Sequence, residues 1–164
     1  MEEKKIKVFN DTLKENNIKI VCAESITAGL LASTIASISG ASEVLAGSIV
    51  TYNWDFKTTV LGVNLQTLEY KSAESVETTA EMCNGVMRLY PSANLFVAVT
   101  GMASKPGPEY PGTAEVGQIF VVIWYKGELY RYEEKFGELK RNTIREKTVD
   151  FIFEKILSII NPLV

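Results

Sequence analysis

The sequence predicts a three-layer α/β/α domain with a mixed β-sheet, in which a C-terminal β-hairpin is followed by a long helix. Three observations predict this fold. Segments with helical spacing of apolar residues alternate with short apolar segments that are typical of buried strands. Two strand-like segments then flank Lys126-Gly127, which is a hairpin signal. No repeat, linker or low-complexity segment divides the chain, so residues 1–164 are expected to form a single domain.

The first half of the chain alternates helices with strands. The expected elements are a helix over 3–16, a strand over 18–23, a helix over 27–37, a turn over 39–42, a strand over 44–52, and short helices over 55–61 and 65–70. Asn16-Asn17 ends the first helix, and Asn64 is the expected N-cap of the last one. The apolar positions of the first helix are Ile6, Val8, Phe9 and Leu13.

The second half contains the clearest helical pattern and the hairpin. The expected elements are a helix over 75–90, a strand over 94–100, a loop over 102–115, strands over 116–125 and 128–136, and a helix over 138–160. Pro91 stops the first of these helices, and the loop holds three of the five prolines. The apolar positions that predict the two helices are Val76, Ala80, Cys83 and Met87, and then Ile144, Val149, Ile152, Phe153, Ile156 and Leu157.

Charge and composition exclude several classes of partner. The net charge of −3 provides no basic field to attract nucleic acid. The longest apolar run is far shorter than the ~20 residues that cross a bilayer, so no membrane partner is expected. The N-terminal residues lack the apolar core of a signal peptide, which predicts a cytoplasmic protein.

The absence of histidine limits the available chemistry. Mechanisms that use Ser-His-Asp or Cys-His groups are excluded, and a structural zinc site is not expected. Two cysteines do not make a disulfide framework, and Cys22 in its apolar strand is expected to be a buried small side chain. We therefore expect no metal and no cofactor.

A serine, a tyrosine and a lysine are the strongest catalytic candidates. Ser25 and Tyr52 fall at the carboxyl ends of expected strands, where α/β sheets bind ligands, and Lys57 follows shortly after. A lysine that is desolvated loses its proton near neutral pH and can then activate a serine, and Tyr52 could pass or hold the proton between them. Backbone N–H groups in the turn after Ser25 could stabilise an oxyanion. The alternative is that Ser25 is an N-cap, Lys57 a solvated lysine and Tyr52 an ordinary strand aromatic.

Other polar residues could contact a phosphate or a sugar. Ser42 and Thr100 are hydroxyl residues at the ends of elements, although turns and caps also use such residues. Arg141 and Arg145 lie four residues apart on one face of the last helix and could bind a phosphate together. A solvated helix face is the alternative for the two arginines.

Several sequence blocks resemble the CinA C-terminal domain family. The blocks are A-E-S-I-T-A-G-L-L-A-S, S-G-A-S-E-V, G-S-I-V-T-Y-N-W-D-F-K and L-G-V, followed by T-G and by F-G-E-L-K-R-N-T-I-R. The family pattern reads A-E-S-C-T-G-G, G-S-S, V-T-Y-S-N-x-x-K and L-G-V, and its spacing from the serine to the tyrosine and the lysine matches this chain without a gap. The resemblance covers nearly the whole chain.

The resemblance implies a function and a set of site residues. Characterised members of the family are nicotinamide-nucleotide amidases, which convert nicotinamide mononucleotide to nicotinate mononucleotide and ammonia. By resemblance, Ser25 is the nucleophile, and Tyr52 and Lys57 are its activating partners. No metal is implied, and a homo-oligomer, a dimer or larger, is expected. The substrate-binding residues expected on this basis are Glu24, Thr27, Gly29, Ser42, Thr100, Gly101, Arg141 and Arg145.

The chain departs from the family pattern at positions around the substrate. Ala28 replaces the first glycine of the Gly-Gly pair, and Trp54 places an indole near the site. The family's G-A-V-S-E becomes S-A-E-S-V at residues 72–76, and the loop that begins at Met102 lacks several glycines. Two alternatives to an amidase therefore stay open. One is a catalytically degenerate CinA-like domain that binds a nucleotide or a protein partner, and the other is a plain α/β scaffold whose hydroxyls are all caps.

Overall fold

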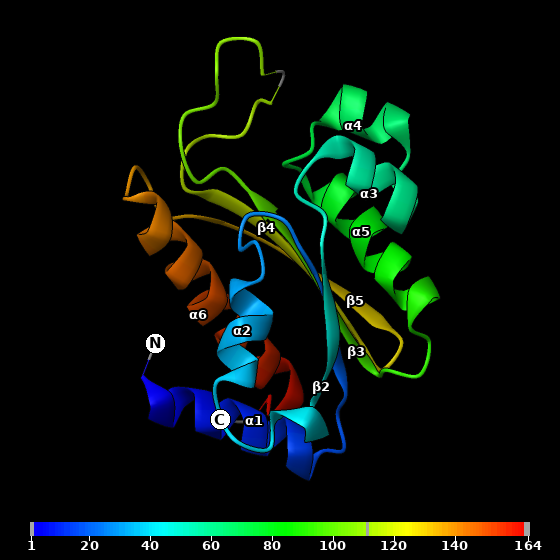
Figure 1. Ribbon diagram of the computed structural model, residues 1–164, viewed down its shortest axis with the longest axis vertical. Coiled ribbons are helices and arrows are strands. Elements are labelled where there is room, and N and C mark those ends of the chain that lie inside the picture. The colour runs from blue at the N-terminus through cyan, green and yellow to red at the C-terminus, as the bar shows by residue number, and fades with distance from the viewer. Residues whose placement is uncertain (1, 111, 163–164) are drawn as a thin grey trace.

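The structure, a computed structural model, describes residues 2–110 and 112–162 and confirms the three-layer α/β architecture (Figure 1). The helices are α1 (Glu3–Glu15), α2 (Leu30–Ala36), α3 (Trp54–Leu61), α4 (Leu65–Lys71), α5 (Val76–Leu89) and α6 (Arg141–Ile160), with a 3₁₀ turn η1 (Ala41–Glu43). The strands are β1 (Ile20–Glu24), β2 (Leu45–Val50), β3 (Leu95–Gly101), β4 (Gln118–Tyr125) and β5 (Glu128–Lys135).

The five strands form one mixed sheet in the order β2-β1-β3-β4-β5. The strands β2, β1 and β3 run parallel, and the hairpin of β4 and β5 adds antiparallel pairs at one edge. Helices α1, α2 and α6 cover one face of the sheet, and α3, α4 and α5 lie on the other (Figure 1). Each face has its own apolar cluster, so the core is divided by the sheet.

The path of the chain creates a switch point beside β1. The connection from β1 to β2 passes through α2 on one face, and the connection from β2 to β3 passes through α5 on the other. In such sheets a crevice forms beyond the carboxyl ends of the central strands, because the two connections leave in opposite directions. Residues that directly follow β1 and β3 are therefore placed at a ligand-binding position.

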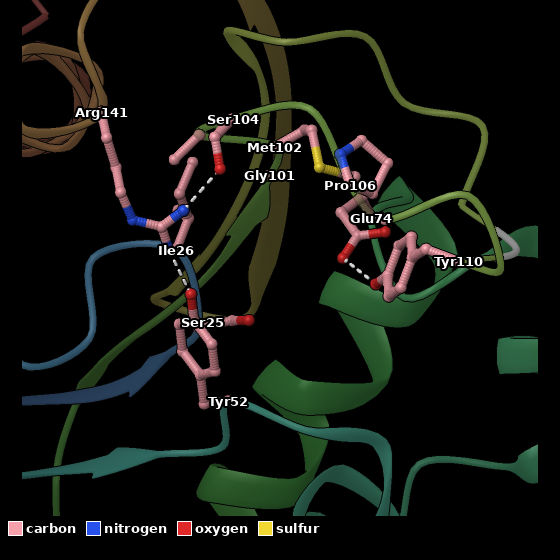
Figure 2. A pocket seen from close by; sticks show the side chains of 12 residues that line it. Ser25, Ile26, Tyr52, Glu74, Gly101, Met102, Ser104, Pro106, Tyr110 and Arg141 are labelled. Atoms are coloured by element: carbon pink, nitrogen blue, oxygen red, sulfur yellow. Dashed lines mark hydrogen bonds between the residues drawn. The ribbon is translucent and has the colours of Figure 1, made fainter.

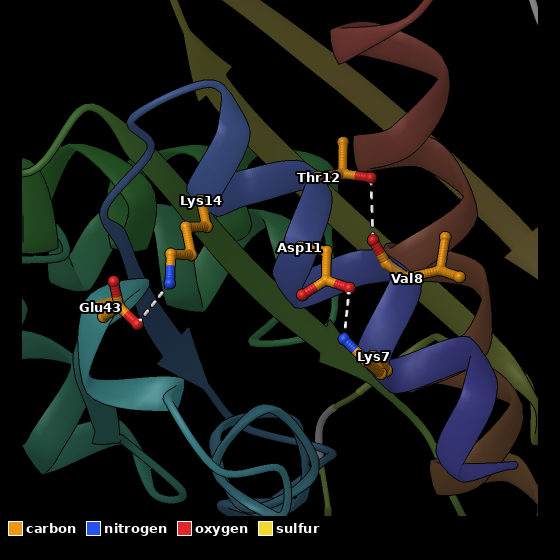
Figure 3. Close-up of polar contacts among 6 residues, drawn as sticks. All are labelled: Lys7, Val8, Asp11, Thr12, Lys14 and Glu43. Atoms are coloured by element: carbon orange, nitrogen blue, oxygen red, sulfur yellow. Dashed lines mark hydrogen bonds and ion pairs between the residues drawn. The ribbon is translucent and has the colours of Figure 1, made fainter.

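Helix α1 buries one face and exposes the other. Its buried residues are Ile6, Phe9, Asn10 and Leu13. The predicted apolar position Val8 instead lies on the outer surface and is 51% exposed. Figure 3 shows that surface, where Lys7 pairs with Asp11 one turn later and Lys14 reaches Glu43 of η1. These exposed pairs contribute little stability, on the order of 0.5 kcal/mol each.

Helix α2 begins three residues later than the sequence predicts. Ala28 and Gly29 have φ values of 47° and 91°, so residues 25–29 form a tight turn and the helix starts at Leu30. The left-handed conformation costs an alanine roughly 1 kcal/mol, a cost that the glycine of the family pattern does not have. Position 28 thus adopts a positive φ, which a glycine accepts at no steric cost.

The remaining elements follow the sequence closely. The side chains of Asn53, Asn64 and Ser75 cap α3, α4 and α5, as expected for Asn64. Lys126 and Gly127 both have positive φ values, 50° and 87°, which confirms the predicted two-residue hairpin turn. Helix α6 begins at Arg141, three residues after the predicted start, since Gly137 forms a turn first.

The two cysteines are free and buried, as predicted for Cys22. Burial raises the pKa of the Cys83 thiol to about 12, which makes it an unreactive thiol at neutral pH. None of the helices in the described part of the chain combines the length and the apolar character that a membrane crossing requires.

Candidate active site

Ser25 is the first residue after β1. Its backbone N–H donates to the carbonyl of Val99 at 3.1 Å, which fixes the serine at the junction of β1 and β3. The chain then leaves the sheet through the turn that contains Ala28 and Gly29. The serine is 7% exposed and lines a pocket at the switch point of the sheet.

Lys57 lies directly against Ser25. The side chain is 1% exposed, and its Nζ lies 3.0 Å from the Oγ of Ser25 and 2.6 Å from the backbone carbonyl of Thr51. Burial lowers the pKa of Lys57 from 10.5 to about 8, against an opposing effect of the Glu74 carboxylate. About one lysine in ten is then neutral at pH 7. A serine in contact with a buried amine of this pKa is the geometry that a lysine general base requires.

Glu24 organises the turn that presents Ser25. Its side chain is fully buried. Its Oε2 accepts hydrogen bonds from the Thr27 hydroxyl at 2.7 Å and from the N–H groups of Gly29 at 2.9 Å and Leu31 at 3.1 Å. Its Oε1 accepts from the N–H of Ala32 at 3.0 Å and from the Ser48 hydroxyl at 2.8 Å. The carboxylate thus caps the start of α2, where the helix dipole also favours a negative charge.

These contacts change the role expected for three residues. Glu24, Thr27 and Gly29 are predicted above to bind substrate, but the structure directs their polar groups at one another and they do not line the pocket. The turn still leaves backbone donors for an oxyanion. Among the described residues, the N–H groups of Ile26 and Thr27 have no acceptor, and Ile26 lines the pocket.

The pocket has a volume of about 230 Å³ and lies over Ser25 (Figure 2). Its walls are Ser25-Ile26, Tyr52, Glu74, Arg141 and the loop between Gly101 and Tyr110. Ligand pockets usually measure about 300–1,000 Å³. The cavity is therefore smaller than a typical ligand pocket.

Tyr52 and Arg141 form one rim of the pocket. The guanidinium of Arg141 donates to the Tyr52 hydroxyl and to the Ser104 hydroxyl, the latter at 2.7 Å (Figure 2). Ser25 and Lys57 are in direct contact, so the structure does not place Tyr52 between them as a proton relay. Arg141 makes no ion pair with a carboxylate in residues 2–110 and 112–162. Its charge is therefore available to an anionic ligand.

Three other predicted binding residues lie away from the pocket. Ser42 belongs to η1, which precedes β2, so it lies at the opposite end of the parallel strands from Ser25. Thr100 is fully buried, with its hydroxyl 2.8 Å from that of Thr79. Arg145 donates to the carbonyl of Thr27 at 2.7 Å and so supports the turn after Ser25. Of the predicted binding residues, only Gly101 and Arg141 line the pocket.

Sequence reasoning missed Glu74 and Tyr110. The Tyr110 hydroxyl donates to the Glu74 Oε1 at 2.6 Å across the second rim of the pocket (Figure 2). The only signal for Glu74 was that it departs from the family pattern. No group of three or more His, Cys, Asp or Glu side chains in the described ranges is placed to hold a metal ion.

Comparisons with known proteins agree with the sequence resemblance. The model of the CinA C-terminal domain matches residues 2–160. A CinA-like protein of Thermotoga neapolitana is 32% identical over 155 residues, which are 94% of this chain but only 37% of that protein. The chain thus spans little more than a third of such relatives. The Mycoplasma pneumoniae protein named MG115 homolog is 30% identical over 157 residues, which are 96% of this chain and 98% of the relative.

A solved structure has the same fold. The crystal structure of the competence/damage-inducible protein CihA from Agrobacterium tumefaciens superposes with a TM-score of 0.85 at 31% identity, covering 97% of this chain and 94% of that one. The match extends over the sheet and both helical layers.

Proposed function

The chain belongs to the CinA C-terminal domain family, and from this premise we propose that it is an amidohydrolase that deamidates nicotinamide mononucleotide. The observation that carries the proposal is the contact of 3.0 Å between the Lys57 Nζ and the Oγ of Ser25, which lines the pocket. A buried lysine with a pKa of about 8 in that contact is poorly explained by stability alone, because burying an ammonium is costly.

The proposed reaction proceeds through an acyl-enzyme. Neutral Lys57 takes the proton of Ser25 as the Oγ attacks the carboxamide carbon, and the resulting ammonium then protonates the departing nitrogen, which leaves as ammonia. A water molecule next gives its proton to Lys57 and attacks the ester carbon, which releases nicotinate mononucleotide, and the Lys57 ammonium returns that proton to the Ser25 Oγ. The carbonyl of Thr51, 2.6 Å from the Nζ, orients the amine in both steps.

Two further groups support the same reaction. The unpartnered N–H of Ile26 is the proposed donor to the oxyanion, since it directly follows the nucleophile and lines the pocket. Arg141 at the rim is the proposed partner of the substrate phosphate, because its guanidinium is exposed and makes no ion pair with a carboxylate of the described chain. Tyr52 holds Arg141 through its hydroxyl.

The pH dependence of ammonia release tests this function. Because the active form of Lys57 is neutral and its pKa is about 8, kcat/KM should rise about tenfold per pH unit between pH 6 and pH 7.5 and level off above pH 8.5. The measurement is ammonia release from nicotinamide mononucleotide by the purified chain in buffers of constant ionic strength.

Absence of ammonia release at every pH would overturn the amidase proposal. A rise in melting temperature with the nucleotide, without turnover, would instead support the alternative of a degenerate domain that binds a nucleotide. This alternative is tested because the loop between Gly101 and Tyr110, which lines the pocket, lacks several glycines of the family pattern.

A further inference from the structure

Glu74 is a carboxylate that faces the pocket without a cationic partner. It lines the cavity over Ser25 and is partly buried. Its Oε1 accepts from the Tyr110 hydroxyl at 2.6 Å, and its Oε2 accepts from the Ser72 hydroxyl at 3.1 Å. Both donors are neutral, and no Lys or Arg in residues 2–110 and 112–162 forms an ion pair with it. Such a carboxylate is oriented by the protein without a direct ion pair.

The local backbone holds Glu74 in this position at a cost. Ser72, the C-cap of α4, has a φ of 78°, which a serine rarely adopts. Its hydroxyl also accepts from the N–H of Glu74 at 3.2 Å, so the turn and the carboxylate are bound together. Burial and the bond to Glu74 raise the pKa of Tyr110, so its hydroxyl stays a donor at neutral pH. The family pattern has glycine and valine at positions 72 and 74, so Ser72 and Glu74 depart from that pattern.

The pocket places opposite charges on its two rims. Figure 2 shows Arg141 on one side, Glu74 with Tyr110 on the other, and Ser25 between them in that view. The negative charge of Glu74 also acts electrostatically on Lys57, because it raises the pKa of that side chain. A ligand with a negative group near Arg141 and a positive group near Glu74 would match both rims.

We propose that Glu74, held by Tyr110, determines specificity by selecting carboxamides whose ring carries a positive charge. The inference rests on the proposed function and names its substrate class. A pyridinium ring with a carboxamide and a phosphate has its positive charge next to the scissile group and its negative charge at the far end. An uncharged ring of the same shape gains nothing from Glu74, because Coulomb attraction requires both charges.

The test compares a cationic and a neutral substrate of the same shape. The pair is nicotinamide mononucleotide and its benzamide analogue, in which carbon replaces the ring nitrogen. The wild-type chain should prefer the cation in kcat/KM, and Glu74→Gln should reduce the preference at least tenfold while keeping the side-chain shape. Because Glu74→Gln also lowers the pKa of Lys57, both substrates are measured across the pH range, and only their ratio is compared.

Two further variants separate charge from structure. Glu77→Gln removes a carboxylate that lies outside the pocket and pairs with Lys71, so the preference should stay as in the wild type. Tyr110→Phe keeps the charge and loses one orienting bond, so the preference should fall by a smaller factor than in Glu74→Gln. An unchanged preference in Glu74→Gln would overturn the inference.

A binding measurement keeps this inference separate from the proposed function. In a Ser25→Ala background the dissociation constants of the two ligands can be measured without turnover. If the wild-type chain releases no ammonia but the cation binds more tightly through Glu74, the amidase proposal fails and the inference stands. If ammonia is released but Glu74→Gln weakens both ligands equally, the function stands and the inference fails.

Discussion

Replacing Lys57 with methionine is expected to reduce kcat/KM for ammonia release by about 10²- to 10⁴-fold, the range typical of a lost general base. The Lys57 Nζ is the group in contact with the Ser25 Oγ, and the chain contains no histidine to replace it. The residual activity should also lose the rise with pH that a base of pKa about 8 produces. Steady-state ammonia release between pH 6 and pH 9 measures both effects.

The methionine variant should fold. Lys57 is 1% exposed, so its ammonium is disfavoured in the folded state by on the order of 3 kcal/mol at pH 7. This penalty is fully present below pH 8 and is relieved as the pH rises toward 10.5, where the unfolded lysine also loses its proton. Methionine fills the space without a charge but leaves the Thr51 carbonyl without its donor, so the two effects offset.

Lys71→Met is the matched control for this prediction. Lys71 lies on α4, is largely exposed and pairs with the exposed Glu77, so activity and stability should both stay close to wild type. Wild-type activity with an unchanged pH profile in Lys57→Met would show that another group activates the nucleophile.

Replacing Glu24 with alanine is expected to cost about 3–5 kcal/mol of unfolding free energy. The fully buried carboxylate accepts five hydrogen bonds, from the Thr27 and Ser48 hydroxyls and from three backbone N–H groups at the start of α2. Alanine leaves these donors without an acceptor inside the protein, and each buried unpaired donor costs about 1–3 kcal/mol before relaxation. Urea unfolding followed by circular dichroism gives the difference.

The control for Glu24 is a surface carboxylate of the same length. Glu43 is about half exposed and pairs with Lys14, so Glu43→Ala should cost less than about 1 kcal/mol. A loss of that small size in Glu24→Ala would contradict the capping role. It would also reopen the prediction that Glu24 binds substrate.

The catalytic pair could be predicted because both residues occupy positions that a sequence pattern defines. Ser25 follows a fully buried strand, and Lys57 lies on the short helix after the next strand. Parallel strands bring such positions to one edge of the sheet, and the absence of histidine leaves few other bases. The contact itself depends on the burial of Lys57, which no periodicity shows.

The misplaced binding residues have physical explanations. Ser42 precedes its strand, whereas Ser25 follows its own, so the two hydroxyls lie at opposite ends of the sheet. Helix α2 begins later than predicted because Ala28 and Gly29 have positive φ values, although they are small residues like those of the helix itself. The start of the helix is capped by the side chain of Glu24, eight residues before Ala32. Because the capping residue lies at the end of the preceding strand, the sequence next to the helix start contains no capping motif that would predict it.

The second rim of the pocket could not be predicted for a different reason. Tyr110 lies in a loop without periodicity, and Glu74 lies between two helices. Their contact joins residues 36 positions apart, and it depends on how that loop folds over the pocket. The homo-oligomer expected from the family resemblance likewise stays a prediction.

Ammonia release from nicotinamide mononucleotide by the wild-type chain and by Ser25→Ala tests the central claim most directly. The two proteins are compared at pH 8.5, where Lys57 is mostly neutral, after circular dichroism has shown that both are folded. We predict steady release by the wild-type chain and a loss of at least 10³-fold in the variant, because the proposed nucleophile, whose Oγ contacts the Lys57 amine, is removed. Equal rates of release would show that Ser25 is not the nucleophile and would contradict the account.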